Sequence, residues 1–172
     1  MSKIVIIESS LNKRSKSERL AKEAYTHLNK EEATLISLGE YNLPLCDGGS
    51  VYADPNVQKL TQELESAKGV LIATPIYNYT INSALKTAIE CTGKKGWENK
   101  TVGFLVAAGG AGSYMAIMGI ANSLMLDFRC VIIPRFVYAK PDDFENGDLV
   151  SEEIKTRVKE LSDEMVRFTS VL

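Results

Sequence analysis

Residues 74–86 read Thr-Pro-Ile-Tyr-Asn-Tyr-Thr-Ile-Asn-Ser-Ala-Leu-Lys and directly follow the apolar run 70–73. The apolar run predicts a strand, and the residues after it predict a polar, aromatic turn that opens a helix. In open α/β sheets, ligands bind at the carboxyl ends of such strands. This stretch therefore indicates an α/β fold and marks the place where a ligand is expected.

The rest of the chain repeats this alternation of short apolar runs and amphipathic helix patterns. Apolar, largely β-branched runs predict strands at residues 4–7, 33–38, 70–73, 101–108 and 130–133. Helical spacing predicts helices after Ser15, after Asp54-Pro55, over 84–92, over about 113–127 and from residue 151. Gly69 is expected to end the second helix. Helical crossovers between strands predict a parallel sheet with helices on both faces.

Composition predicts one soluble domain. The chain has 172 residues, 45% of them hydrophobic, which is enough for one core and small for two, so we expect a single domain over residues 1–172. A formal net charge of −2 argues against binding to nucleic acid or to an anionic membrane surface. The run 4–7 is too short for a signal peptide, and charged residues interrupt the stretch 115–137. We therefore expect a cytoplasmic protein without a membrane span.

Few residues of this chain are suited to direct catalysis or metal binding. Cys46, Cys91 and Cys130 form no Cys-x-x-Cys pair, which fits buried free thiols in a reducing compartment. His27 is the only histidine and falls late in the first predicted helix. One histidine excludes a three-histidine zinc site, and a Ser-His-Asp triad would depend on this residue alone. We expect no metal site and no catalytic side chain, so a bound cofactor should carry the chemistry.

Two doubly wound strand orders compete for this pattern: the dinucleotide-binding order and the flavodoxin-like order 2-1-3-4-5. The loop after the first strand, residues 8–17, contains no glycine and so lacks the Gly-x-Gly-x-x-Gly fingerprint of the first order. The Gly-Lys-Ser/Thr of a Walker A loop is missing as well. These absences favour the flavodoxin-like order, a three-layer α/β/α sandwich with a five-stranded parallel sheet.

In that order, the loops after the first, third and fourth strands meet at one edge of the sheet. The first loop offers hydroxyl, amide and cationic side chains at a helix N-terminus, where free N–H groups bind phosphate. Taken alone, it is explained equally well by Ser15 capping the helix. The third loop offers Pro75, Tyr77 and Asn78 to an aromatic ring, and the glycine-rich fourth loop, residues 109–112, permits close approach of a flat ligand.

At these loops the chain resembles the NADPH-dependent FMN reductase family, flavodoxin-like enzymes that include azo-dye, quinone and chromate reductases. The family's first-loop pattern, Gly-Ser-x-Arg-x-x-Ser-x-Asn, is matched at Ser10 and Ser15. Its third-strand pattern is Thr-Pro-Glu-Tyr-Asn-Gly-Ser-Ile-Pro, followed by a helix. That pattern is matched more fully, at Thr74, Pro75, Tyr77, Asn78, Ile81, Leu85, Lys86, Ala88, Ile89 and Glu90.

The chain also departs from both patterns. Asn12 stands where the family has arginine, and Ile76 stands where it has glutamate. Tyr79 and Thr80 replace Gly-Ser, and Asn82 replaces the second proline. The first change removes a charge beside the expected phosphate. The others alter the edge of the expected ring site, so we expect substrate preference to depend on Ile76, Tyr79 and Asn82.

The resemblance implies an FMN-dependent enzyme that takes hydride from NADPH or NADH and passes electrons to a small-molecule acceptor in a ping-pong cycle. The implied FMN-binding residues are Ser10, Asn12, Ser15, Lys16 and Ser17 at the phosphate, Pro75, Ile76, Tyr77 and Asn78 at the isoalloxazine ring, and Gly109, Gly110 and Gly112 on its other side. The alternative is a flavodoxin-type electron carrier with little NAD(P)H activity. Such carriers are strongly acidic around the flavin, whereas this first loop is basic. A non-flavin phosphate-binding protein is a third reading.

Residues 115–126 form a predicted helix that is apolar on nearly every side. Such a helix is usually buried, whereas an outer helix of a doubly wound fold has one face in solvent. We therefore expect this helix to form a subunit interface in a homodimer or homotetramer. The resemblance implies the same, because members of the family commonly form dimers or tetramers.

Overall fold

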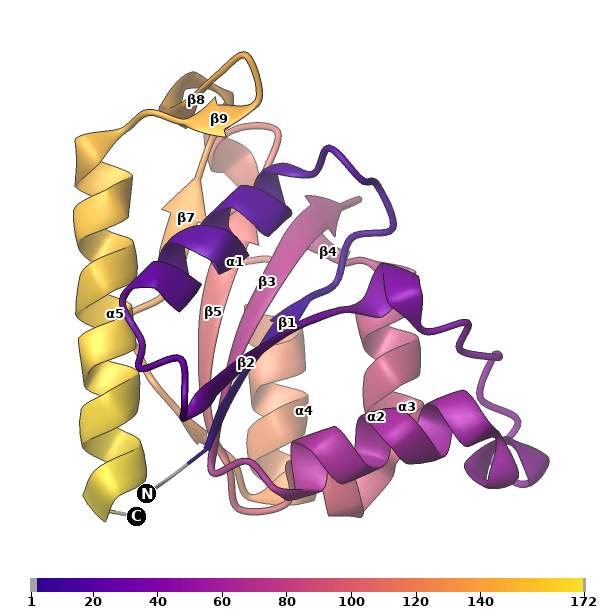
Figure 1. The fold of residues 1–172 in the computed structure, drawn as a ribbon. Helices are drawn as coiled ribbons and strands as arrows, with labels where there is room; N and C mark the ends of the chain where they lie inside the picture. Colours follow the sequence, from indigo (N-terminus) through magenta and orange to yellow (C-terminus); the bar gives the residue numbers. More distant parts are fainter. Residues whose placement is uncertain (1–2, 172) are drawn as a thin grey trace.

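The computed structural model describes residues 3–171 (Figure 1). Its main sheet is built around β1, and all five residues of this strand are buried. β1 pairs in parallel with β2 and β3, β3 pairs with β5, and β5 pairs with β6 and β7. The bounds are β1 (Ile4–Glu8), β2 (Ala33–Ser37), β3 (Gly69–Tyr77), β5 (Thr101–Ala107), β6 (Val131–Ile132) and β7 (Val137–Ala139). The order β2-β1-β3-β5-β6 confirms the predicted flavodoxin-like order.

Helices cover both faces of this sheet, as Figure 1 shows. Their bounds are α1 (Lys16–Thr26), α2 (Pro55–Glu65), α3 (Ser83–Trp97), α4 (Met118–Phe128) and α5 (Glu152–Val171). Ile6 packs in one core with Leu20 of α1, and the next residue, Ile7, packs in the other core with Leu64 of α2. Alternate strand residues thus feed opposite layers. Within residues 3–171, no helix has the length and apolar character needed to cross a membrane.

Local capping signals fix where two of the helices begin. Ser15 is the N-cap of α1, and its hydroxyl accepts the backbone N–H of Ser17 at 3.2 Å. Asp54 is the N-cap of α2 and accepts the N–H groups of Asn56 and Val57 at 2.8 and 3.2 Å. Both predicted helix starts are confirmed. The helices begin at these residues because a polar side chain there satisfies backbone donors that the first helical turn leaves open.

The segment predicted as a turn after the third strand is a continuation of that strand. β3 extends to Tyr77 and forms a hairpin with β4 (Thr80–Ile81), with Asn78 and Tyr79 at φ values of 50° and 61° in the turn. Pairing with β1 ends at Ala73, so Pro75 lies where β3 has lost one neighbour and tolerates a proline. The predicted helix then begins at Ser83.

Three further boundaries differ from those predicted. The glycine loop passes through the 3₁₀ turn η3 (Ala111–Ser113), so α4 begins at Met118 rather than near residue 113. The last strand is split into β6 and β7 around Pro134. A second hairpin, β8 (Phe144–Glu145) and β9 (Asp148–Leu149), was not predicted, although its Asn146-Gly147 turn is a strong hairpin signal. The remaining 3₁₀ turns are η1 (Leu38–Glu40), η2 (Ser50–Ala53) and η4 (Pro141–Asp143).

Gly69 was predicted to end the second helix, but this prediction is wrong: Gly69 is the first residue of β3. α2 ends earlier, with Ser66 as its C-cap. A Cβ atom at Gly69 would lie 2.4 Å from Sδ of Met165 and 2.6 Å from Cγ2 of Thr169, both on α5. The glycine is therefore needed for the close approach of α5 to the sheet.

Gly69→Ala is expected to destabilise the fold by roughly 1–3 kcal/mol, because the buried side chains of α5 must move to admit the methyl group. Urea unfolding measures this change. Gly119→Ala is the control, since a Cβ on this glycine of α4 meets no described atom within 4 Å. Alanine favours the helix by roughly 1 kcal/mol, so the control should lose no stability. Equal stability of Gly69→Ala and the original chain would contradict this account of the α5 contact.

Candidate functional site

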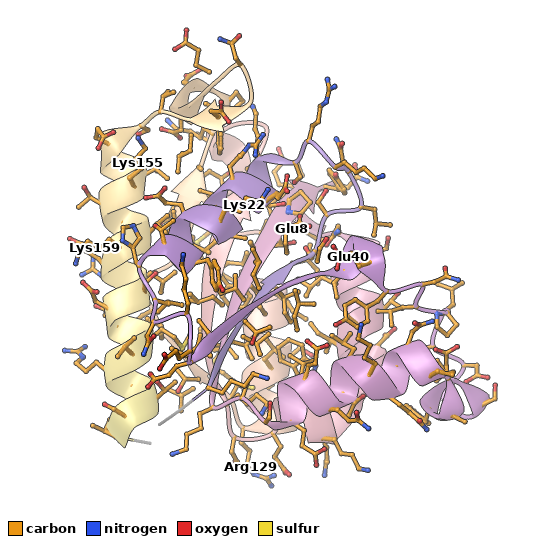
Figure 2. The ribbon with its side chains drawn as sticks, viewed as in Figure 1. Glu8, Lys22, Glu40, Arg129, Lys155 and Lys159 are labelled. Carbon is orange, nitrogen blue, oxygen red and sulfur yellow. The ribbon has the colours of Figure 1, made fainter. Side chains whose placement is uncertain are left out.

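The loops after β1, β3 and β5 share one edge of the sheet because the strand register brings their ends together. Glu8 at the end of β1 lies opposite Ala73 of β3, and Pro75 of β3 lies opposite Ala107 of β5. Figure 2 shows Glu8 and Glu40 close to this edge. The three loops that were predicted to hold a ligand are therefore neighbours in space.

The first loop is folded by its own polar side chains. The backbone N–H of Asn12 donates to Oγ of Ser10 at 3.1 Å, and that of Arg14 donates to Oδ1 of Asn12 at 3.1 Å. Ser15 and Ser17 are buried, with their hydroxyl oxygens 2.6 Å apart. Ser10 is buried as well, whereas Asn12 is exposed. The predicted phosphate ligands thus form one compact turn before α1.

Several backbone donors of this turn remain open. Among residues 3–171, no hydrogen-bond acceptor faces the N–H groups of Leu11, Lys13, Ser15 and Lys16. Open N–H groups at a helix N-terminus favour an anion, because the helix dipole adds to their attraction. The side chain of Lys16 does not point into the turn: its Nζ lies 5.2 Å from the ring centroid of Phe144. Backbone rather than Lys16 therefore supplies the donors.

The buried side chain of Asn82 ties the first loop to β3. Its Nδ2 donates to the carbonyl oxygen of Ser9 at 2.6 Å, and its Oδ1 accepts the hydroxyls of Ser9 at 3.0 Å and Thr74 at 3.3 Å. Asn82 is one of the residues on which substrate preference is expected to depend. Its side chain is 5% exposed and both amide atoms are engaged, so it holds the two loops in position.

The third and fourth loops enclose an open hollow of about 300 Å³. A Cβ on Gly112 would lie 3.6 Å from the hydroxyl oxygen of Tyr79, so the missing side chain leaves room on that side. The hydroxyl of Tyr138 donates to the carbonyl oxygen of Gly110 and lies 2.8 Å from Oγ of Ser113, which fixes the loop. The lining residues are Ile76, Asn78, Tyr79, Gly109, Gly110, Gly112 and Ser113.

Two of the predicted ring residues are placed outside this lining. Pro75 is buried in β3. Tyr77 is 54% exposed and is not among the described residues that border the hollow, whereas Ile76 and Tyr79 are. Tyr77 follows Ile76 in β3, and successive residues of a strand point to opposite faces. Tyr79 lies beyond the strand, in the turn with φ of 61°.

A buried carboxylate that was not predicted lies under the first loop. Oε1 of Glu8 accepts the N–H of Ser10 at 2.8 Å and the hydroxyl of Ser17 at 3.1 Å, and Oε2 accepts the hydroxyl of Ser37 at 3.2 Å. Burial raises the pKa of the Glu8 carboxyl, and the nearby charge of Glu18 raises it further. The three hydrogen bonds lower that pKa but do not cancel the rise.

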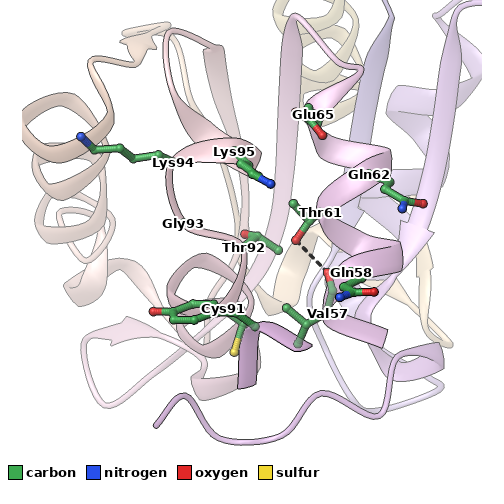
Figure 3. A pocket seen from close by; sticks show the side chains of 11 residues that line it. Val57, Gln58, Thr61, Gln62, Glu65, Cys91, Thr92, Gly93, Lys94 and Lys95 are labelled. Atoms are coloured by element: carbon green, nitrogen blue, oxygen red, sulfur yellow. Dashed lines mark hydrogen bonds between the residues drawn. The ribbon is translucent and has the colours of Figure 1, made fainter. Parts of the chain in front are cut away.

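A separate hollow of about 520 Å³ lies between α2 and α3 (Figure 3). Val57 and Thr61 line it from α2, and Cys91, Lys94 and Lys95 line it from α3. None of the predicted site residues borders it. No group of three or more His, Cys, Asp or Glu side chains within residues 3–171 is arranged to hold a metal ion.

The sequence profile of one family, described as NADPH-dependent FMN reductase, matches residues 2–145. The chain belongs to this family. As a member of the NADPH-dependent FMN reductase family, it is an NAD(P)H-dependent flavin oxidoreductase that uses FMN, as the resemblance implied.

Individual relatives of this family member share about a quarter of its residues. An NAD(P)H-dependent FAD/FMN reductase of Geobacillus thermodenitrificans is 28% identical over 87% of this chain and 82% of its own. An NADPH azoreductase of a Bacillus species is 25% identical over 98% of this chain and 93% of its own. The structure of the flavoenzyme NAD(P)H:(acceptor) oxidoreductase FerB from Paracoccus denitrificans superposes with a TM-score of 0.79 over 99% of this chain and 98% of its own, at 20% identity, which supports the fold.

Asn82→Ala is expected to lower the stability of this family member by roughly 2–3 kcal/mol, because it leaves the buried carbonyl oxygen of Ser9 without its donor. Urea unfolding gives the loss. Asn42→Ala removes an exposed amide and serves as the control, with an expected change within about 0.5 kcal/mol. Similar curves for the two variants would mean that Asn82 does not hold the two loops together.

Proposed function

We propose that this chain binds FMN at the carboxyl edge of its sheet and uses NADPH or NADH to reduce free flavin, quinone, azo compounds or similar small acceptors. One observation carries the proposal: a glycine-lined hollow and a turn with open backbone N–H groups are held at the same sheet edge by Asn82.

The residues present fit the two ends of FMN. Glycines at 109, 110 and 112 permit a flat ring to lie against backbone, and Ile76 and Tyr79 offer apolar surface beside them. No charged side chain of the described residues lines that hollow, which suits an uncharged ring system. The open N–H groups before α1 suit the phosphate.

FMN, when bound, supplies the hydride and electron transfer, and the protein supplies binding, orientation and electrostatics. The side chains that line the hollow include no histidine, carboxylate or lysine that could move a proton. Asn78, in the hairpin turn with φ of 50°, is the polar residue that lines the hollow from the third loop. The role of this chain's own residues is therefore to place the ring and leave one side open to the nicotinamide and the acceptor.

The relatives support small acceptors rather than a protein partner. Relatives described as an NADPH azoreductase and as an NAD(P)H:quinone oxidoreductase of Solanum tuberosum are 25% and 27% identical to this chain. A flavodoxin-type electron carrier is not favoured by membership of a reductase family. The free thiols Cys46, Cys91 and Cys130 are consistent with the cytoplasm as the site of action.

We also propose a homodimer or homotetramer that associates through α4. Large apolar side chains on and before this helix are exposed: Met115 is 62%, Met118 43% and Leu126 77% accessible. Contiguous exposed apolar surface of this kind marks interaction sites on soluble proteins. The inner face of α4, with Ile120 and Leu124, is already buried against the sheet, so the outer face is left for a second subunit.

The flavin proposal predicts an anaerobic titration result. FMN-loaded protein should bleach on addition of NADPH or NADH and recover its colour when a quinone is added.

Gly112→Leu, which fills the hollow between the loops, should weaken FMN binding by at least about tenfold, because steric overlap in a site costs more than 1.4 kcal/mol. Thr61→Leu, in the hollow between α2 and α3, is the matched control and should leave binding unchanged. A yellow protein inert to both nicotinamides would instead indicate an electron carrier.

The interface proposal predicts the mass in solution. Light scattering at micromolar concentration should give at least twice the chain mass of 18.9 kDa, and Leu126→Asp should shift the protein toward a single chain, because a buried charge without a partner opposes association. Val166→Asp, at an exposed apolar position of α5, should keep the original mass. A single-chain mass for the original protein would overturn the proposal.

A further inference from the structure

The position of Glu8 bears on how the first loop treats a phosphate. Its side chain is 4% exposed, and it already holds two groups that the resemblance assigns to the FMN phosphate: the N–H of Ser10 and the hydroxyl of Ser17. These donors have an anionic partner before any ligand arrives. A phosphate in this turn must use the remaining N–H groups, in the immediate neighbourhood of a carboxylate.

The groups around Glu8 do not neutralise it. A hollow of about 370 Å³ under the loop is bordered by Glu8, by Glu18 of α1 and by Glu40 of η1, with Lys13 as its only cation among the described residues. The partner from β2, Ser37, is an uncharged hydroxyl. Figure 2 shows Glu8 and Glu40 near each other at this end of the molecule.

Two cations that could compensate are missing from the turn. Asn12 stands where the family pattern has arginine, and the ammonium group of Lys16 lies over the ring of Phe144. The charge of Glu8, which is buried and therefore only weakly screened, would oppose a phosphate bound at the open N–H groups of the same turn.

We propose that Glu8 makes this site poorly selective for phosphorylated flavin, so that riboflavin and FMN bind with similar affinity, and that FMN binds together with a proton taken up by Glu8. This inference rests on the proposed function and adds to it the class of flavin that the site accepts: riboflavin and FMN alike. Riboflavin has no phosphate, so its binding does not involve the charge on Glu8.

The direction of the pH effect follows from the charge. Burial already favours the protonated carboxyl, since it raises the pKa of Glu8, and a bound phosphate dianion favours that form further. FMN affinity is therefore highest where Glu8 is protonated. It falls as pH rises through the pKa of Glu8 in the free protein and levels off above the pKa of Glu8 in the complex. Glu18, Glu40 and Lys13 face the same hollow, and of these only the carboxylates add to the repulsion.

Fluorescence titrations with FMN and riboflavin over a pH series test the proposal. In the original chain at pH 8, we expect the two dissociation constants to agree within about threefold. FMN affinity should fall relative to that of Glu8→Gln as pH rises through the titration of Glu8, a comparison that removes the titration of the phosphate itself. Riboflavin affinity should stay constant.

Glu8→Gln keeps an oxygen that can accept from Ser10 and Ser17 but removes the charge. It should bind FMN about tenfold more tightly than the original chain at pH 8, lose most of the pH dependence and bind riboflavin unchanged. Glu40→Gln is the control. It removes a carboxylate that borders the same hollow but accepts no hydrogen bond from the described residues of the first loop, so it should change FMN affinity by less than about threefold.

A measurement on the original chain needs no variant. At the pH where FMN affinity falls, calorimetric titration with FMN in two buffers of different ionisation enthalpy should show proton uptake, and titration with riboflavin should show none. FMN binding that is pH-independent, without proton uptake, and at least about a hundredfold tighter than riboflavin binding would overturn the role of Glu8 while leaving the flavin site intact. Failure of both flavins to bind would overturn the proposed function and this inference with it.

Discussion

The carboxyl edge of this sheet depends on the buried side chain of Asn82. Pairing of β1 with β3 brings Glu8 opposite Ala73, and the last backbone hydrogen bond runs from the N–H of Ser9 to the carbonyl oxygen of Ala73 at 3.0 Å, while β3 continues beside β5. Asn82 adds a side-chain connection at this point because an amide both donates and accepts: it gives a proton to the carbonyl of Ser9 and receives protons from the hydroxyls of Ser9 and Thr74. An ionised carboxylate could only accept, and a hydroxyl carries its donor and acceptor on one atom, whereas the amide separates them onto two atoms. The hollow and the open turn keep their relative positions for this reason.

Local signals explain why many of the helices and strands could be predicted from the sequence. Asp54-Pro55 starts a helix with an oxygen acceptor and a preset φ, and Ile4 to Ile7 is apolar because helices cover both faces of β1. The end of β3 could not be predicted in this way. Whether Pro75 is extended depends on Ala107, which lies on another strand, and the turn that follows places Asn78 and Tyr79 in a left-handed conformation that few side chains favour.

The candidate site likewise contains residues that local sequence patterns identify and residues that they do not. Ser10 and Ser15 could be identified because they lie in a short pattern next to a helix start, and their contact with FMN stays a prediction. The roles of Glu8 and Asn82 could not be predicted, since each has a partner from a distant segment: Ser37 is 29 positions from Glu8, and Ser9 is 73 positions from Asn82. A polar residue at a strand end looks the same in sequence whether it faces solvent or three buried donors.

The two ends of the candidate flavin site differ in their physics. The hollow between the third and fourth loops is lined by uncharged groups, so what it contributes to binding scales with buried area and does not vary with pH. The first loop acts through charge, and there a count of charged side chains gives the wrong sign for the site. Lys13, Arg14 and Lys16 make the segment basic, but Lys16 packs on Phe144 and Arg14 is exposed. The anionic Glu8, by contrast, is buried beneath the loop. Because a buried charge is screened less than an exposed one, the single carboxylate outweighs cations that water surrounds. Retention of the phosphate can thus change through position 8 alone, without any change in the surface offered to the ring.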